Sequence, residues 1–173
     1  MSDVEIPGRD RKFLIVICGI VTASVIVAGG LIWWRHPKDI FDAAWRGDAK
    51  AVERFLARGV GPNSLNDVKD IPLHLAKTRD VAELLLARGS NLDQPNGFGG
   101  TPLHMAAVNA RPEVAAFLIE RGANVNALDI IGATPLDHAL IGRRDKIGRD
   151  RDAVIRLFQS KGGVARHYAD LLK

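Results

Sequence analysis

The longest run of apolar positions lies near the amino terminus. Residues 13–34 read FLIVICGIVTASVIVAGGLIWW and contain no charged side chain. An α-helix rises about 1.5 Å per residue, so this segment reaches about 33 Å and can cross the ~30 Å hydrocarbon core of a bilayer. The pattern predicts one transmembrane helix over 13–34, between a tail at 1–12 and a linker at 35–38.

The ends of the run suit a membrane segment. Trp33 and Trp34 stand where amphipathic rings prefer the membrane interface, and Pro37 then stops the helix. A secretory signal cleaved near Ala28 stays open as an alternative, although the apolar run continues past that site. A lipoprotein anchor at Cys18 is excluded, because Ile17 precedes the cysteine and the apolar run continues after it.

Charges and small residues add two expectations about the span. Three basic residues precede it closely and two follow it, so positive charge predicts a cytosolic amino terminus, with residues 35–173 outside the cytosol. Gly19, Ala23, Ile26 and Gly30 share one helix face, where two helices can approach closely. Contact with the lipid bilayer is therefore expected, and this face would allow weak self-association, although small residues are common in membrane helices in general.

Beyond residue 38 the apolar pattern repeats. IPLHLA at 71–76, TPLHMAA at 101–107 and TPLDHAL at 134–140 align, and IFDAAWRGD at 40–48 fits the same register. Leucine or isoleucine stands at 40, 73, 103 and 136, and alanine at 43, 76, 106 and 139. A second series, RFLARG, LLLARG, FLIERG and LFQSKG, follows each first segment. Such a regular period indicates stacked units that share one core.

This pairing of T-P-L-H with a downstream glycine resembles the ankyrin repeat, over residues 39–173. The resemblance implies an all-α solenoid of about four helix-turn-helix repeats with finger loops, at about 39–70, 71–100, 101–133 and 134–173. It implies protein binding as the function, and a structural hydrogen-bonding role for the histidines. The motif residues are Pro72, Leu73, His74, Thr101, Pro102, Leu103, His104, Thr134, Pro135 and Leu136, with Gly59, Gly89, Gly122 and Gly162 after the second helices.

The motif also has a direct physical explanation. Threonine is a favoured helix cap, proline suits the first helical position, and small alanines let helices pack closely. The glycines are expected to end the second helices in a left-handed conformation.

Two repeats depart from the pattern. Repeat 2 is shorter from its repeated alanine to its glycine, Ala76 to Gly89, than repeats 1 and 3, which predicts a shortened inter-helix turn. Ile71 also replaces the threonine cap, so repeat 2 is expected to be the weak joint. Repeat 4 is longer over the same interval, and its extra length contains the basic run at 143–156. That run is expected to be a solvated loop, or else a contact to a partner or an anion.

Charge and chemistry exclude several classes of function. The 173 residues carry 24 basic and 20 acidic side chains, without the concentrated basic face of a nucleic-acid-binding protein. No catalytic or phosphate-binding motif occurs, and one cysteine allows no intrachain disulfide. His74 and His104 stand at equivalent positions of adjacent repeats, too far apart to share a metal. Neither an enzyme activity nor a metal or cofactor is expected.

What remains is a recognition surface for a protein. The fingertips carry exposed apolar side chains that either pack on neighbouring fingers or bind a partner. Trp45 either caps the groove or touches the bilayer, and His138, one position after the expected histidine, is expected to face the groove. The candidate partner-binding residues are Trp45, Phe98, Ile130, Ile131, His138, Arg143 and Arg144.

These features predict a membrane-tethered protein-binding module of bacterial type, with a periplasmic repeat domain. Two alternatives remain: a structural or accessory subunit of a membrane complex, and a tethered inhibitor or immunity-type protein that blocks an envelope toxin or hydrolase.

Overall fold

A computed structural model describes residues 37–141 and 148–167 of the chain. Residues 39–173 form one compact unit, and its described part consists of helices and turns without a strand. The all-α prediction is thus confirmed for the described residues. The span predicted at 13–34 lies outside them, and no helix within the described ranges is long and apolar enough to cross a membrane.

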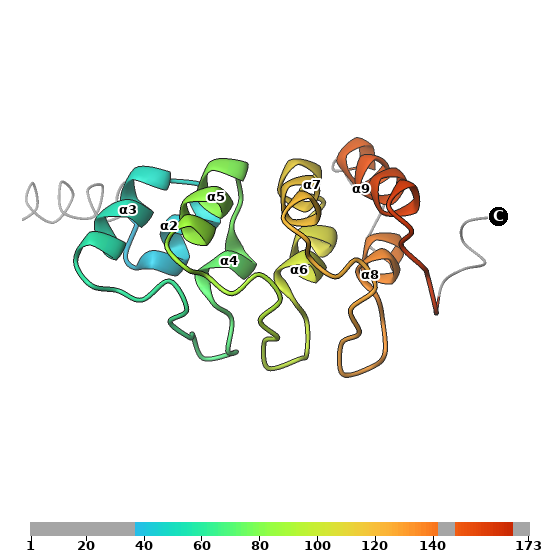
Figure 1. The fold of residues 1–173 in the computed structure, drawn as a ribbon, viewed down its shortest axis with the longest axis horizontal. Coiled ribbons are helices and arrows are strands. Elements are labelled where there is room, and N and C mark those ends of the chain that lie inside the picture. The colour runs from blue at the N-terminus through green and yellow to red at the C-terminus, as the bar shows by residue number, and fades with distance from the viewer. Residues whose placement is uncertain (1–36, 142–147, 168–173) are drawn as a thin grey trace, which may run out of the picture. The chain divides into compact units, whose positions relative to one another are not determined.

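Eight helices form four pairs in this part of the chain (Figure 1). They are α2 (Ile40–Arg46) with α3 (Ala49–Ala57), α4 (Pro72–Leu75) with α5 (Arg79–Ala87), α6 (Pro102–Val108) with α7 (Pro112–Glu120), and α8 (Pro135–Ile141) with α9 (Gly148–Ser160). A long loop follows each of the first three pairs, and all three loops extend to the same side. We call these loops fingers 1, 2 and 3: residues 59–70, 89–100 and 122–133.

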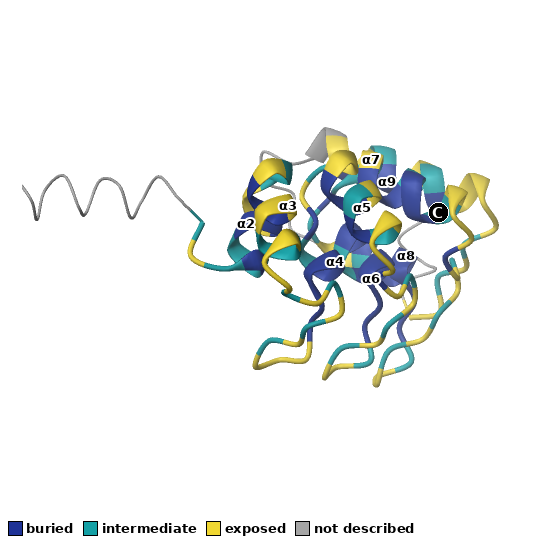
Figure 2. Cartoon of the chain, turned by 60° about the vertical axis from the view of Figure 1, so that its left-hand side comes forward, coloured by how far each residue is buried: buried dark blue, intermediate teal, exposed yellow. Residues whose placement is uncertain are grey.

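The helices stack in two rows. The first helices of the pairs form an inner row, in which α2 contacts α4, α4 contacts α6, and α6 contacts α8. The second helices form an outer row, α3, α5, α7 and α9, with the same order of contacts. Buried residues lie where the rows face each other, and exposed residues cover the outer row and the fingers (Figure 2). No single pair could bury its apolar side without its neighbours.

The periodic positions make the core of this stack. The repeated leucine or isoleucine and alanine positions are all buried: Ile40, Leu73, Leu103 and Leu136, with Ala43, Ala76, Ala106 and Ala139. The four glycines after the second helices have φ between 77° and 94°, the left-handed region. The prediction for these glycines is therefore confirmed. Glycine suits this region because it has no Cβ to clash with the following backbone.

The missing residues of repeat 2 fall in its first helix, so the prediction of a shortened turn is wrong. The turn from α4 to α5, Ala76 to Thr78, is as long as the turn from α6 to α7. Helix α4 has four residues, whereas α2, α6 and α8 have seven. Helix α5 must start at the position along the stack's helix direction that lets it pack between α3 and α7. The helix that leads to it therefore absorbs the deletion.

The basic run of repeat 4 also differs from expectation. Its second half belongs to α9, which has 13 residues where the other second helices have nine. Arg151 is buried in this helix, and its guanidinium donates to Ala139 O at 3.1 Å and to Val108 O at 3.3 Å. This arginine caps the carboxyl ends of α8 and α6 instead of lying on a solvated loop.

The short helix predicts lower local stability in repeat 2. A four-residue helix has a single turn and few internal hydrogen bonds, and Ile71 offers no side-chain acceptor. In native-state hydrogen exchange, amides of α4 and α5 should exchange about tenfold faster than those of α6 and α7, equivalent to about 1.4 kcal/mol of opening free energy. Equal protection of the two repeats would contradict this prediction.

Candidate protein-binding surface

Each finger is a hairpin closed by backbone hydrogen bonds. Asn66 N donates to Asp70 O at 3.0 Å, Asn96 N to Gly100 O at 2.9 Å, and Asp129 N to Ala133 O at 3.1 Å. These pairs occupy equivalent positions of successive repeats, so the fingers share one conformation.

A single side chain organises each fingertip. In finger 2 the Oδ1 atom of Asn96 accepts from the N–H groups of Phe98 at 2.9 Å and Gly100 at 3.0 Å. Asp129 repeats these bonds in finger 3, to Ile131 N and Ala133 N. Asparagine and aspartate favour such turns because their short side chains reach the backbone two residues on. The residue in the middle of the turn must therefore point away from the finger.

These middle residues are apolar in every finger. Val68, Phe98 and Ile131 stand at the same repeat position, and all three are exposed. Phe98 keeps 60% of its surface accessible, Ile131 66%, and the neighbouring Ile130 69%. Leu65 and Leu128 form a second exposed apolar position in fingers 1 and 3. We call Leu65, Val68, Phe98, Leu128, Ile130 and Ile131 the fingertip row.

The fingers are tied into one surface. Gly97 N donates to Val68 O at 2.9 Å, and Ile130 N donates to Phe98 O at 3.1 Å. A Cβ on Gly99 would lie 2.8 Å from Ile130 N and 3.1 Å from Ile130 Cγ2, so only glycine lets the fingers approach this closely. Ile130 thus contacts the neighbouring finger, yet most of its side chain stays accessible. The packing alternative for the fingertips therefore holds in part, and partner binding stays a prediction.

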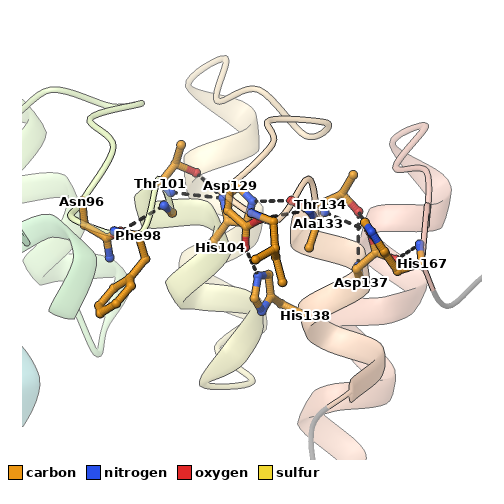
Figure 3. A network of polar contacts seen from close by, with 12 residues as sticks. Asn96, Phe98, Thr101, His104, Asp129, Ala133, Thr134, Asp137, His138 and His167 are labelled. Carbon is orange, nitrogen blue, oxygen red and sulfur yellow. Dashed lines mark hydrogen bonds and ion pairs between the residues drawn. The ribbon is translucent and has the colours of Figure 1, made fainter.

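Buried histidines connect the starts of α4 and α6 to the finger that follows each helix pair. His104 Nδ1 accepts from Thr101 N at 3.1 Å, at the start of α6, and Nε2 donates to Ala133 O at 3.2 Å, at the end of finger 3 (Figure 3). His74 makes the same bonds, to Ile71 N at 3.1 Å and to Gly100 O at 3.0 Å. The hydrogen-bonding role that the resemblance implied is confirmed, and it also extends to the next repeat.

Repeat 4 keeps this junction with an aspartate. Asp137 accepts from Thr134 N and Oγ1 at 2.9 and 3.0 Å, and from the backbone N–H groups of Arg166 and His167 (Figure 3). Burial would raise the pKa of this carboxyl, but the hydrogen bonds from Thr134, His167 and Arg166 outweigh it and lower the pKa to about 2. Aspartate therefore keeps, in repeat 4, the bond to the helix start that histidine makes in repeats 2 and 3.

His138 pairs with finger 3. Its Nε2 lies 2.7 Å from Asp129 Oδ2, and its ring meets the ring of His104 edge-on, with centroids 5.6 Å apart. Burial opposes the charge on Asp129, but the hydrogen bonds from His138 and the fingertip N–H groups lower its pKa. His138 thus braces the finger from the side of α8, and about a quarter of its side chain is exposed.

Of the remaining candidates, Trp45 is half exposed and contacts Arg111, whose guanidinium carbon lies 4.7 Å from the indole centroid. It lies near the carboxyl end of α2, on the inner row. Arg143 and Arg144 lie outside the described residues. The structure therefore brings together Phe98, Ile130 and Ile131, with His138 beneath finger 3, and it places Trp45 elsewhere on the inner row.

Three ion pairs join neighbouring helices of the outer row. Arg88 pairs with Glu53 at 3.2 Å, Arg121 with Glu83 at 3.4 Å, and Arg79 with Glu120 at 3.3 Å, each between neighbouring outer helices. These exposed pairs contribute little stability individually. Across the described ranges, no group of three or more His, Cys, Asp or Glu side chains could hold a metal ion.

A family model of ankyrin repeats, in three copies, matches residues 40–129 and, in an overlapping match, residues 76–149. This chain belongs to the ankyrin-repeat family. No curated protein matches the sequence. The helix pairs and fingers described above are thus ankyrin repeats, and proteins built from them generally mediate protein–protein interaction.

Sequence reasoning misses part of the ankyrin surface. Val68 and Leu65 are absent from the sequence-based candidates, although Val68 shares its repeat position with Phe98 and Ile131. Extending the alignment from the helices into the fingers would reveal it. Arg111 is missed because it lies outside the repeated motif and acts across repeats.

The buried histidines make stability depend on pH. Burial lowers the pKa of His74 and of His104 below 6.5, their ordinary value. The unfolded chain therefore binds protons that the folded chain excludes, and the free energy of unfolding should fall as the pH drops below about 6.5. Urea denaturation followed by circular dichroism at pH 7.5 and 5.5 measures this. The lowered pKa values of Asp129 and Asp137 act at lower pH, below their ordinary 3.8.

The matched control is the double variant His74→Gln/His104→Gln. Glutamine at this helix position can still accept from the N-cap N–H, but it does not titrate. The variant should lose most of the stability difference between the two pH values. An unchanged or inverted difference would refute the assignment.

Proposed function

We propose that this chain is a membrane-tethered protein-binding module that captures a protein partner on its fingertip row. The observation that carries the proposal is the apolar, exposed middle residue of each fingertip turn, at Val68, Phe98 and Ile131. Apolar and aromatic anchors that lose their water on binding dominate interface energies. Isolated apolar residues on a surface need no explanation, but exposed apolar residues at the same position of three adjoining fingers do.

The rigidity of the row supports the same function. Backbone hydrogen bonds join neighbouring fingers, and His74 and His104 fix the ends of fingers 2 and 3 to the starts of α4 and α6. A surface that is ordered before binding loses little conformational entropy when the partner docks. The contribution of each anchor to affinity is correspondingly larger.

The membrane part of the proposal rests on the sequence. The uncharged stretch at 13–34, with tryptophans at its end, is long enough to span a bilayer. A tether of this kind would confine capture to partners near the membrane, outside the cytosol by the charge rule. An inhibitor of an envelope toxin or hydrolase would suit that placement. We propose no enzymatic activity, since the sequence carries no catalytic motif.

A structural subunit of a membrane complex is the second candidate. Its support is the small-residue face of the predicted span, where Gly19 and Ala23 would let another helix approach. In that case the span, and not the fingertips, would carry the essential contact.

Site-specific photocrosslinking in cells of the source organism separates these candidates. A benzophenone amino acid at position 98 should give a discrete crosslinked product, and the same probe at exposed Gln159 of α9 should not. The double substitution Ile130→Asp/Ile131→Asp should reduce the product at least about 30-fold, as expected for loss of about 2 kcal/mol or more at an interface centre. Folding should be preserved, because both side chains are exposed.

The control for the second candidate is Gly19→Leu/Ala23→Leu. If this change abolishes the product while Ile130→Asp/Ile131→Asp leaves it intact, the fingertip proposal fails and the structural-subunit proposal stands.

Orientation is tested by reporter fusions after Lys173. A reporter active only outside the cytosol should give a signal, and one fluorescent only in the cytosol should remain dark. The reverse result would place the repeats in the cytosol and redirect the search for partners. The same two fusions after deletion of residues 13–34 provide the reference for an untethered chain.

A further inference from the structure

A cavity lies beside the turn that follows the shortened helix α4. Repeat 3 continues past Ala106 with Ala107, Val108 and Asn109, and repeat 2 lacks their counterparts after Ala76. A cavity of about 500 Å³ lies there, between α2 and the turn from α6 to α7. The residues that line it include Trp45, Lys77, Asn109, Arg111, Glu113 and Asp150. Cavities of this size are typical of ligand sites.

Arg111 is fixed inside this cavity by contacts to the end of the shortened helix and to Trp45. Its Nη1 donates to Leu75 O and Ala76 O, both at 2.9 Å, which are the last carbonyls of the short helix. Its guanidinium also stacks on Trp45 at 4.7 Å, a favourable cation–π distance. A long side chain held at three points is pre-organised, so a ligand that meets it loses less entropy on binding.

Within the described part of the chain, no carboxylate forms an ion pair with Arg111, and its Nε and Nη2 groups form no hydrogen bond. Burial lowers its pKa to about 10, so the group stays charged at neutral pH at a cost in solvation. Lys77 adds a second cation, at an exposed position of the lining. An incoming carboxylate would recover part of that solvation cost and accept from the remaining donors.

Two acidic residues limit which anions can enter. Glu113 and Asp150 line the same cavity and are exposed, so solvent screens them more than it screens Arg111. They leave the lining with no net charge. Multiply charged anions such as phosphate would meet their repulsion, whereas a single carboxylate on an apolar stem could reach Arg111 along the indole of Trp45.

We infer that this cavity is a second contact site of the protein partner and binds one of its glutamate or aspartate side chains, with the carboxylate on Arg111 and Lys77. The inference rests on the proposed protein-binding function and adds to it. The fingertip row supplies apolar anchoring, and the cavity selects an acidic residue at a fixed distance from those anchors.

Trp45 fluorescence tests the inference without knowledge of the partner. The chain has three tryptophans, so the double substitution Trp33→Phe/Trp34→Phe leaves only Trp45. The experiment uses this full-length variant in detergent micelles. Addition of the peptide acetyl-Ala-Ala-Glu-Ala-Ala-amide should change the emission of Trp45 until the site is saturated. A Kd of about 1 mM is expected, because the peptide makes only one small contact. The glutamine peptide of the same sequence should bind at least about tenfold more weakly, and inorganic phosphate should have no effect.

Variants assign the binding to the named residues. Lys77→Gln should weaken the glutamate peptide about threefold, and Arg111→Lys, which keeps the charge but loses the guanidinium fork, at least about tenfold. Ile130→Asp/Ile131→Asp should leave the titration unchanged, so a failure of the fingertip proposal is distinguishable from a failure at this cavity. Three results would each overturn the inference. They are equal affinity for the two peptides, the absence of a saturable change in Trp45 emission up to about 20 mM peptide, and a Kd for the glutamate peptide that Lys77→Gln does not change.

Discussion

The hydrogen bonds that buried histidines make from α4 and α6 to the next finger are the contacts on which this structure depends. A repeat domain has no contacts between distant parts of the sequence beyond those of neighbouring units. The position of each repeat therefore depends on its contacts to the neighbouring repeat. Here a buried side chain at the third helical position holds the start of its own helix with one polar atom and the end of the following finger with another. Because the helix and the finger share one side chain, the position of the helix determines the position of the fingertip.

The exposure of the fingertip row follows from that arrangement. The polar side chains at 66, 96 and 129 satisfy the turn backbone from within, so the middle residue of each turn projects outward, away from its own finger. On a mobile loop, apolar residues at these positions could fold back onto the protein and bury their surface. On fingers tied to each other they remain accessible. The same rigidity that orders the core is thus what keeps the fingertip row exposed.

Much of this could be predicted from sequence, because the relevant information is local and repeated. The core positions, the helix starts at the prolines and the left-handed glycines all follow from the repeat period. The location of the deletion in repeat 2 could not be predicted, since the outer helix is positioned by its neighbours in the stack, and sequence spacing does not contain that constraint. The contacts of Arg111 and Arg151 could not be predicted either. Both bind carbonyl groups of other helices, and neither stands at a repeated position.

The exchange of histidine for aspartate at position 137 determines whether the stack can be extended. His74 and His104 donate to a carbonyl of the next finger, but the segment that follows α9 presents the N–H groups of Arg166 and His167 at this place, and only an acceptor can bind them. A fifth unit copied from repeat 3 would bring a carbonyl against the Asp137 carboxylate, oxygen against oxygen. Gene duplication could therefore lengthen this array readily between internal repeats, but at its last junction only together with a change at residue 137.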